Sequence, residues 1–169
     1  MNPTATFYMA NGKKIVVELL PESAPNTVAS FIWCAGHGWL DNHAIQRIVP
    51  GSWVDLSYQA FHHKECAYLI PNEFTLHPEI TPLESHPGCV CMGGYGEMGL
   101  AGCEPFFPLR DCPEHKGVYP VFGKVIEGIE AVDHIADLET DYMDRPTKYP
   151  VMEEVTVETF GEEYKPERK

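Results

Sequence analysis

The sequence predicts a mainly β domain, built from short strands in a closed barrel or a sandwich, with two helices far apart in the chain. Turn residues point that way, because 14 glycines and 15 prolines among 169 residues divide the apolar runs into short pieces. A hairpin signal stands near the N-terminus, and two segments have helical periodicity. We expect a single domain over residues 1–169, whose charged tail, 161–169, frays.

The N-terminal part predicts a hairpin followed by a helix. The apolar runs Ala5–Met9 and Lys14–Leu20 flank Asn11-Gly12, a dipeptide typical of a two-residue hairpin turn. Pro25 suits the first turn of a helix. Gly36 and Gly38 mark the end of that helix. The apolar stripe of this helix is Val28, Phe31, Ile32 and Ala35.

The rest of the chain predicts more short strands and a second helix. His43–Val49 and Ser52–Ser57 are the next strand candidates, and residues 58–88 are expected to form long surface loops. A glycine-rich loop is expected over residues 93–102. The later strands are expected at Cys89–Met92, Phe106–Leu109, Tyr119–Ile126 and Val151–Phe160. The second helix follows Gly128 and carries an apolar face of Ile129, Val132, Ile135 and Ala136.

The charge balance and the apolar runs exclude several classes of partner. The formal net charge is −13, and an acidic surface repels phosphate backbones, so nucleic-acid binding is not expected. No apolar run approaches the ~18 residues of a membrane span, and the first residues do not resemble a signal peptide. We therefore expect a cytoplasmic protein without a membrane partner.

In a cytosolic chain the six cysteines are expected to be reduced and buried, or to be metal ligands. Cys89 and Cys91 would point to the same side of a strand, which favours burial as small core residues. Two short-spaced motifs leave a metal site open as an alternative: His62-His63-x-x-Cys66 and His86-x-x-Cys89-x-Cys91. Neither has the paired Cys-x-x-Cys of structural zinc sites, so we predict no metal. A redox role for Cys103 or Cys112 is a second alternative, although Asp111 and Glu114 disfavour a thiolate at Cys112.

Five segments, in one order along the chain, resemble the cyclophilin family. They are Ile15–Pro25 with Asn26-Thr27-Val28 and Phe31, then Gln46-Arg47-Ile48-Val49-Pro50-Gly51, Gly88–Met92, Phe106-Phe107 and Val121–Gly128. The second is similar to the active-site strand of that family, and the last matches its penultimate strand and turn almost letter for letter. The resemblance implies a closed eight-stranded antiparallel β-barrel capped by two α-helices.

The same resemblance implies peptidyl-prolyl cis-trans isomerisation, with proline-containing peptides or unfolded chains as partners. Resonance sets the barrier to rotation of the amide at about 18–20 kcal/mol. No bond breaks, so the reaction requires no cofactor or nucleophile. A fixed donor aimed at the prolyl nitrogen stabilises the twisted amide, while an apolar pocket grips the ring. We expect the protein to work as a monomer.

Arg47 matches the catalytic arginine of the family, and its guanidinium offers several donors in a rigid fork. Phe107 matches an aromatic residue of the proline pocket. Phe106 and Phe107 alternate along a strand, so one should face in and the other out. The remaining substrate-binding residues that the resemblance implies are Trp53, Asp55, Met92, Gly93, Gly94, His115 and Tyr119.

Several positions depart from the family pattern. Asp55 replaces a glutamine that contacts substrate, and a carboxylate there could pair with Arg47, orienting it while competing with substrate. Pro105 stands where the family has a glutamine, and it offers neither an amide side chain nor a backbone donor. The alternative to an isomerase is therefore a catalytically weak or inactive module that binds proline-containing segments.

Overall fold

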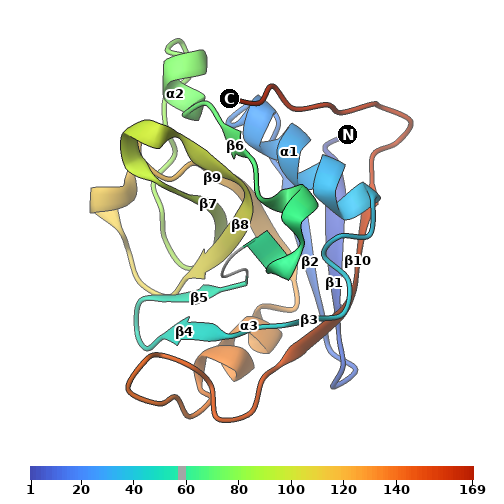
Figure 1. Cartoon of the computed structure of the whole chain (residues 1–169), viewed down its shortest axis with the longest axis vertical. Helices are drawn as coiled ribbons and strands as arrows, with labels where there is room; N and C mark the ends of the chain where they lie inside the picture. Colours follow the sequence, from blue (N-terminus) through green and yellow to red (C-terminus); the bar gives the residue numbers. More distant parts are fainter. Residues whose placement is uncertain (57–59) are drawn as a thin grey trace.

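The computed structural model describes residues 1–56 and 60–169, and over these residues ten strands form one curled antiparallel sheet (Figure 1). The strands follow the order β3-β10-β1-β2-β9-β7-β8-β5-β4, with β6 paired to β8. Their bounds are β1 Thr4–Met9, β2 Lys14–Leu19, β3 His43–Ala44, β4 Arg47–Val49, β5 Trp53–Asp55, β6 Leu69–Ile70, β7 Cys89–Gly94, β8 Leu100–Pro108, β9 Val121–Glu127 and β10 Val151–Glu158. The helices are α1 Pro25–Gly36, α2 Glu73–Leu76 and α3 Ile129–Ala136, with single 3₁₀ turns η1 Ala60–His62, η2 Lys64–Cys66, η3 Gly96–Met98 and η4 Pro113–His115.

The expected closed eight-stranded barrel is wrong in detail, because the sheet curls without closing. The predicted strand His43–Val49 is two short strands that belong to opposite ends of the sheet order. His43 and Ala44 pair with β10, whereas Arg47–Val49 pairs with β5. The chain thus changes partners at Ile45 and Gln46, and the sheet stays open there within the described residues.

The N-terminal hairpin is confirmed, with Tyr8 paired to Lys14 across the predicted turn. The side chain of Asn11 accepts a hydrogen bond from the backbone N–H of Lys13 at 2.9 Å. Gly12 has φ +84°, a left-handed conformation that favours glycine. The strand predicted at Ser52–Ser57 is found as Trp53–Asp55, while its last residue and residues 58 and 59 lie outside the described residues.

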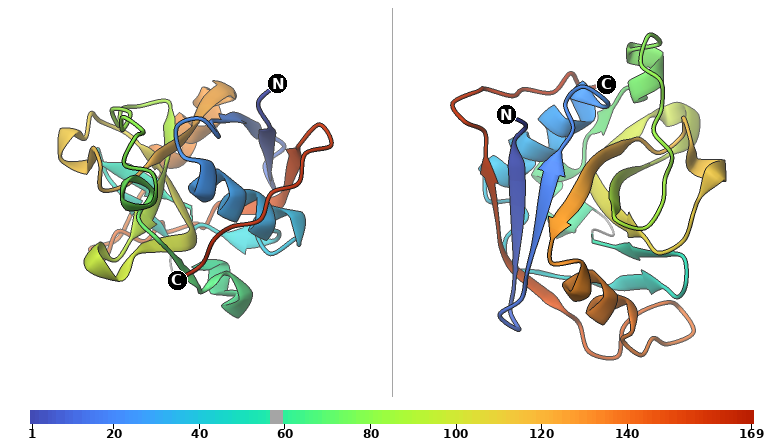
Figure 2. Two further views of the ribbon diagram at one scale, coloured as in Figure 1. Left: turned by 90° about the horizontal axis from the view of Figure 1, so that it is seen from above. Right: turned by 180° about the vertical axis from the view of Figure 1, so that it is seen from behind.

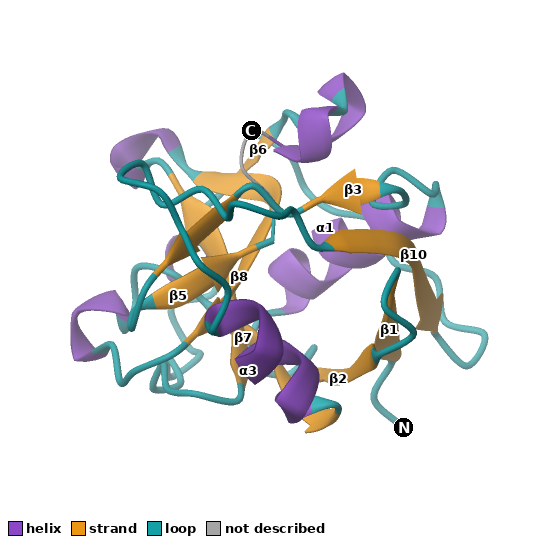
Figure 3. Cartoon of the chain, turned by 90° about the horizontal axis from the view of Figure 1, so that it is seen from below, coloured by secondary structure: helices purple, strands orange, loops and turns teal. Residues whose placement is uncertain are grey.

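Both predicted helices are confirmed, and they lie at opposite ends of the curled sheet (Figures 1 and 3). Helix α1 packs against β8 and β10, and α3 packs against β2 and β5. Gly128 opens α3 in a left-handed conformation, and a Cβ there would fall 2.0 Å from the carbonyl oxygen of Lys14. Only glycine fits this approach of helix to strand.

The first turn of α1 is capped from elsewhere in the chain. Ala24, at the N-cap, makes no side-chain hydrogen bond. Instead, the buried carboxylate of Glu73 in α2 accepts from the backbone N–H and the hydroxyl of Thr27, both at 2.8 Å. An acidic group is favourable at a helix N-terminus, so α2, a helix that the sequence did not predict, fixes the start of α1.

The C-terminal tail is docked, contrary to the expectation that it frays (Figure 2). The amide side chain of Asn26 in α1 makes two hydrogen bonds with the backbone of Glu167, at 3.0 and 2.7 Å. The guanidinium of Arg168 lies 3.9 Å from the ring centre of Tyr68, and the N–H of Lys169 donates to Leu69. The tail is held because its backbone groups and its cation meet matched partners on α1 and beside β6.

Residues 60–88 contain short elements in place of one long loop: η1, η2, β6 and α2. Of the helices in the described parts of the chain, none has the length and apolar character that crossing a membrane requires.

Candidate active site

A cavity of about 250 Å³ opens beside strands β4 and β5, the β7–β8 hairpin and the turn η4. It is lined by Arg47, Trp53, Asp55, Gly93, Gly94, Tyr95, Glu104, Phe106, His115 and Tyr119. Seven of these belong to the set predicted from sequence, so the fold brings most of that set to one place. The predicted residues that do not line the cavity are Met92 and Phe107.

Arg47 and Asp55 face each other across neighbouring strands. They are register partners of β4 and β5, and Nη1 of Arg47 lies 3.3 Å from Oδ2 of Asp55. Their side chains keep 38% and 15% of their surface exposed. Contact of Arg47 with water weakens this ion pair, so the pair can orient Arg47 and still yield to a competing ligand.

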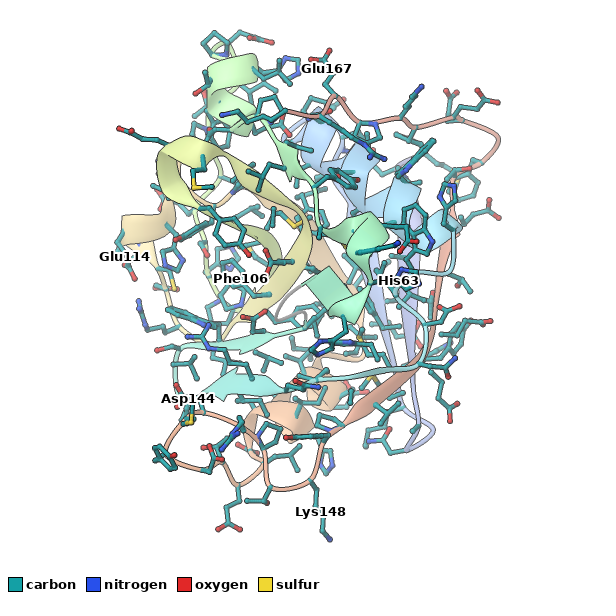
Figure 4. All side chains as sticks on the ribbon, viewed as in Figure 1. His63, Phe106, Glu114, Asp144, Lys148 and Glu167 are labelled. Atoms are coloured by element: carbon teal, nitrogen blue, oxygen red, sulfur yellow. The ribbon has the colours of Figure 1, made fainter. Side chains whose placement is uncertain are left out.

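The two phenylalanines of β8 point to opposite faces of the sheet, and the prediction for Phe107 is wrong. Phe107 is 1% exposed within the main core, with its ring 6.1 Å from that of Phe7. Phe106 lines the cavity instead, where Figure 4 labels it. Successive side chains of a strand alternate between faces, so only one of the two can reach the cavity. Sequence reasoning expected that one phenylalanine faces each way but assigned the wrong one.

An aromatic group forms the apolar wall of the cavity. The ring of Phe106 lies 6.1 Å from that of Trp53 and 5.9 Å from that of Tyr119, measured between ring centres. The imidazole of His115 closes the group, 5.4 Å from Trp53 and 4.8 Å from Tyr119. The contacts of Tyr119 are edge-to-face and those of Trp53 are tilted; together they hold the rings in place and leave an apolar surface for a small ring to enter.

His115 contributes to this wall as a neutral ring. Burial lowers its pKa, although the carboxylate of Glu114 partly opposes the shift. The side chain is 10% exposed, and its Nδ1 makes no hydrogen bond in the described structure. At neutral pH the imidazole is therefore uncharged and can act as apolar surface.

The predicted glycines form the backbone edge of the cavity. Gly93 and Gly94 end β7. A Cβ on Gly93 would lie 3.1 Å from the carbonyl oxygen of Glu104, so the close approach of β7 to β8 favours glycine there. Met92 is completely buried one residue earlier, and its sulfur lies 3.1 Å from the backbone N–H of Glu104. Met92 thus supports the cavity from the core side.

Sequence reasoning missed Tyr95 and Glu104 as well as Phe106. Glu104 lies two residues before Phe106, so strand alternation puts both on the same face once Phe106 is known to line the cavity. The hydroxyl of Tyr95 donates to the carboxylate of Glu104. The polar side of the cavity consequently combines one guanidinium with two carboxylates.

All six cysteines are free thiols and buried, and for Cys89 and Cys91 this burial was predicted. Cys89 and Cys91 both belong to the apolar cluster beneath the cavity, and burial raises the pKa of Cys91 to about 12. Burial likewise raises the pKa of Cys112. Cys66 lies in the main core, so it is separated from the histidines of its sequence motif, which are exposed.

Comparison with known proteins connects this arrangement to one class. The family model described as cyclophilin type peptidyl-prolyl cis-trans isomerase matches residues 4–157. Peptidyl-prolyl cis-trans isomerase B of Bacillus subtilis is 30% identical over 79% of this chain and 91% of its own. Peptidyl-prolyl cis-trans isomerase-like 3 of Gibberella zeae is 26% identical over 91% of this chain and 95% of its own.

The fold agrees with that class. A crystal structure of a cyclophilin type isomerase from Cryptosporidium parvum superimposes with a TM-score of 0.78, at 16% identity, over 94% of this chain and 99% of its own. A second structure of that protein, in the presence of the dipeptide Ala-Pro, gives a TM-score of 0.76 over 92% of this chain. The chain belongs to the cyclophilin-type peptidyl-prolyl cis-trans isomerase family.

Proposed function

We propose that this cavity binds a proline residue and catalyses rotation of the amide bond before it, with Arg47 as the catalytic donor. The proline ring would enter the wall formed by Trp53, Phe106, His115 and Tyr119. The observation that carries the proposal is the position of the Arg47 guanidinium in the same 250 Å³ cavity as this wall. A ring held in the wall keeps the prolyl nitrogen next to the cation while the preceding residue turns.

Arg47 acts on the electronic cost of rotation. Twisting the amide ends its resonance and returns the lone pair to the prolyl nitrogen, and this loss makes the barrier about 18–20 kcal/mol. An N–H of the guanidinium donates to that lone pair only in the twisted state, so it stabilises the transition state more than the bound peptide. One such preorganised donor contributes about 2.7–4 kcal/mol, or 10²–10³ in rate.

The backbone edge supplies the remaining contacts. Gly93 and Gly94 border the cavity and offer backbone N–H and C=O groups to an extended peptide. The natural partners would be proline-containing segments of peptides or unfolded chains, and the structure of the Cryptosporidium parvum protein in the presence of the dipeptide Ala-Pro supports this choice. We infer action as a monomer in the cytoplasm, since six free cysteines suit a reducing compartment.

A second function, binding without catalysis, is favoured by one observation. The 3.3 Å pair between Arg47 and Asp55 occupies a donor that the reaction needs. If that pair persisted in the complex, the cavity would hold proline without lowering the barrier. Its partial exposure favours the isomerase, because water already competes for both groups.

Exchange spectroscopy by NMR on a short Ala-Pro peptide tests the proposal. We expect the wild-type protein to speed cis-trans exchange and Arg47→Ala to reduce the enhancement at least about 100-fold. Arg145→Ala is the matched control, because Arg145 also pairs with an aspartate, Asp141, at 2.9 Å, but lies outside the cavity. It should retain wild-type exchange.

Each other result has one meaning. Enhancement that survives in Arg47→Ala would remove Arg47 from the catalytic role. Peptide chemical shifts that change without faster exchange would establish the binding module in place of the isomerase.

A further inference from the structure

We propose that Cys112, Glu114 and His115 form a binding site for a divalent metal ion of the zinc class, on the outer rim of the cavity. One ligand atom from each residue lies within 4.8 Å of the other two. The site stands on the turn η4, where Figure 4 labels Glu114 at the edge of the molecule. It would exist whether or not the cavity isomerises proline.

The local backbone explains why these three side chains converge. Cys112 is the N-cap of η4, and His115 is its last residue. In a 3₁₀ helix, side chains three residues apart lie above one another, so Cys112 and His115 share a face. Two backbone hydrogen bonds hold this geometry: Cys112 N–H donates to Ser85 at 2.9 Å, and His115 N–H donates to Cys112 at 3.0 Å. The site is thus built on a fixed turn.

The donor set suits zinc. Thiolate, imidazole and carboxylate are the three ligand types that Zn²⁺ takes in proteins, and three protein ligands leave a fourth position for water. His115 is nine-tenths buried, and its Nδ1 has no hydrogen-bond partner in the described residues. Its Nε2 lies 3.9 Å from the nearer carboxylate oxygen of Glu114. A neutral imidazole in this position has a lone pair to give to a metal.

Three existing contacts must yield when the ion binds: two with Arg110, and one between the Cys112 thiol and the side chain of Ser85. Glu114 pairs with Arg110 at 2.8 Å, but both side chains are largely exposed, so the pair contributes little. The thiol of Cys112 lies 3.5 Å from the carbonyl oxygen of Arg110. On binding, the S–H bond breaks, the proton passes to the solvent, and the thiolate bonds to the metal.

Titration of the reduced, chelator-treated protein with Zn²⁺ alone tests the site. We expect saturable binding of one ion, weakened at least about ten-fold in Cys112→Ser and less strongly in Glu114→Gln. The matched control is Glu79→Gln, because Glu79 also faces a histidine, His77, at 3.1 Å but has no cysteine beside it. Binding to Glu79→Gln should equal that to the wild type.

Co²⁺ provides a readout that folding alone does not produce. The wild type should show a thiolate-to-cobalt charge-transfer band in the near ultraviolet, and Cys112→Ser should lack it. A second comparison uses the wild-type protein alone. On addition of Zn²⁺, the NMR signals of the His115 ring should shift more than those of the His77 ring. Absence of saturable binding, a band that persists in Cys112→Ser, or equal weakening by Glu79→Gln would each overturn the site.

Discussion

The two faces of β8 each present a phenylalanine, but the two side chains lie in different surroundings. Phe107 lies in the main core and touches Phe7, whereas Phe106, its neighbour in sequence, forms part of the cavity wall with Trp53 and Tyr119. Both side chains are buried, at 1% and 7% exposure, so burial alone does not separate them. What separates them is the neighbourhood: one phenylalanine fills a closed interior, and the other borders a space that a ligand can enter.

Truncating each phenylalanine should sharpen this comparison most. Phe107→Ala opens a void in the closed core, so we expect it to lower the free energy of unfolding by about 3–5 kcal/mol. Phe106→Ala removes a wall that already borders an opening, so its cost in stability should be smaller, while binding of an Ala-Pro peptide should weaken. Urea denaturation and peptide titration of both variants make the test. Equal losses of stability, with peptide binding unchanged in Phe106→Ala, would contradict the division of the two faces.

A buried histidine on the core side should make the protein sensitive to acid. Burial lowers the pKa of His43 to about 4, with a further contribution from the nearby His62, and its Nε2 has no hydrogen-bond partner in the described residues. The unfolded chain binds this proton at a pKa near 6.5. Stability is therefore full above about pH 6.5 and declines as the pH falls toward 4, by at most about 3 kcal/mol.

His43→Leu should flatten that decline, measured as unfolding free energy against pH. His134→Leu, a change at an exposed histidine of α3, should keep the wild-type slope. If His43→Leu loses stability in acid as steeply as the wild type, another group carries the effect.

A third change tests the polar support of the core side. Glu73→Ala leaves the N–H and the hydroxyl of Thr27 without their buried acceptor. We expect a loss of about 2 kcal/mol in unfolding free energy, with peptide exchange unchanged, because Glu73 does not line the cavity. Glu84→Ala, at an exposed ion pair, is the control and should cost less than about 1 kcal/mol. If Glu73→Ala lowers the unfolding free energy no more than Glu84→Ala does, the capping hydrogen bonds contribute little.

How far the sequence predicts this molecule depends on how local the signal is. The first hairpin and both long helices follow from short-range patterns: a turn dipeptide, a proline at the first turn, and an apolar stripe. The split of His43–Val49 into two strands was missed because the partners of each half, β10 and β5, lie far away in the chain. The docked tail was missed for the same reason, since Asn26 holds Glu167 across 141 residues.

The site follows the same rule. Arg47 lies within a matched segment, and the matched segments on either side place Trp53, Asp55, His115 and Tyr119; all five residues line the cavity. The error at Phe107 has a definite physical cause. An assignment based on motif position put Phe107 in the pocket, but the pairing of β8 with β7 sets Phe106 opposite Cys91, in the cluster beneath the cavity. A one-residue difference in register reverses which side chain faces a ligand.

The change with the smallest expected effect distinguishes catalysis from binding without catalysis at the cavity. Asp55→Asn keeps a hydrogen-bond acceptor for Arg47 but removes the charge that pairs with it at 3.3 Å. We expect this partly exposed ion pair to contribute about 1 kcal/mol, so peptide exchange should rise by less than about five-fold as the guanidinium becomes more available. Arg47 would then orient itself without the charged partner.

The same NMR exchange measurement checks this, with Asp141→Asn as the control at the pair outside the cavity. A fall of ten-fold or more in Asp55→Asn would show that the carboxylate is essential to orient Arg47. A rise of ten-fold or more would show that the pair holds the wild-type cavity in a binding state with little catalysis. A small change in exchange rate, together with the loss of exchange in Arg47→Ala, would support Arg47 as the donor. Removing the charge of Asp55 would then alter only the availability of the guanidinium to the prolyl nitrogen.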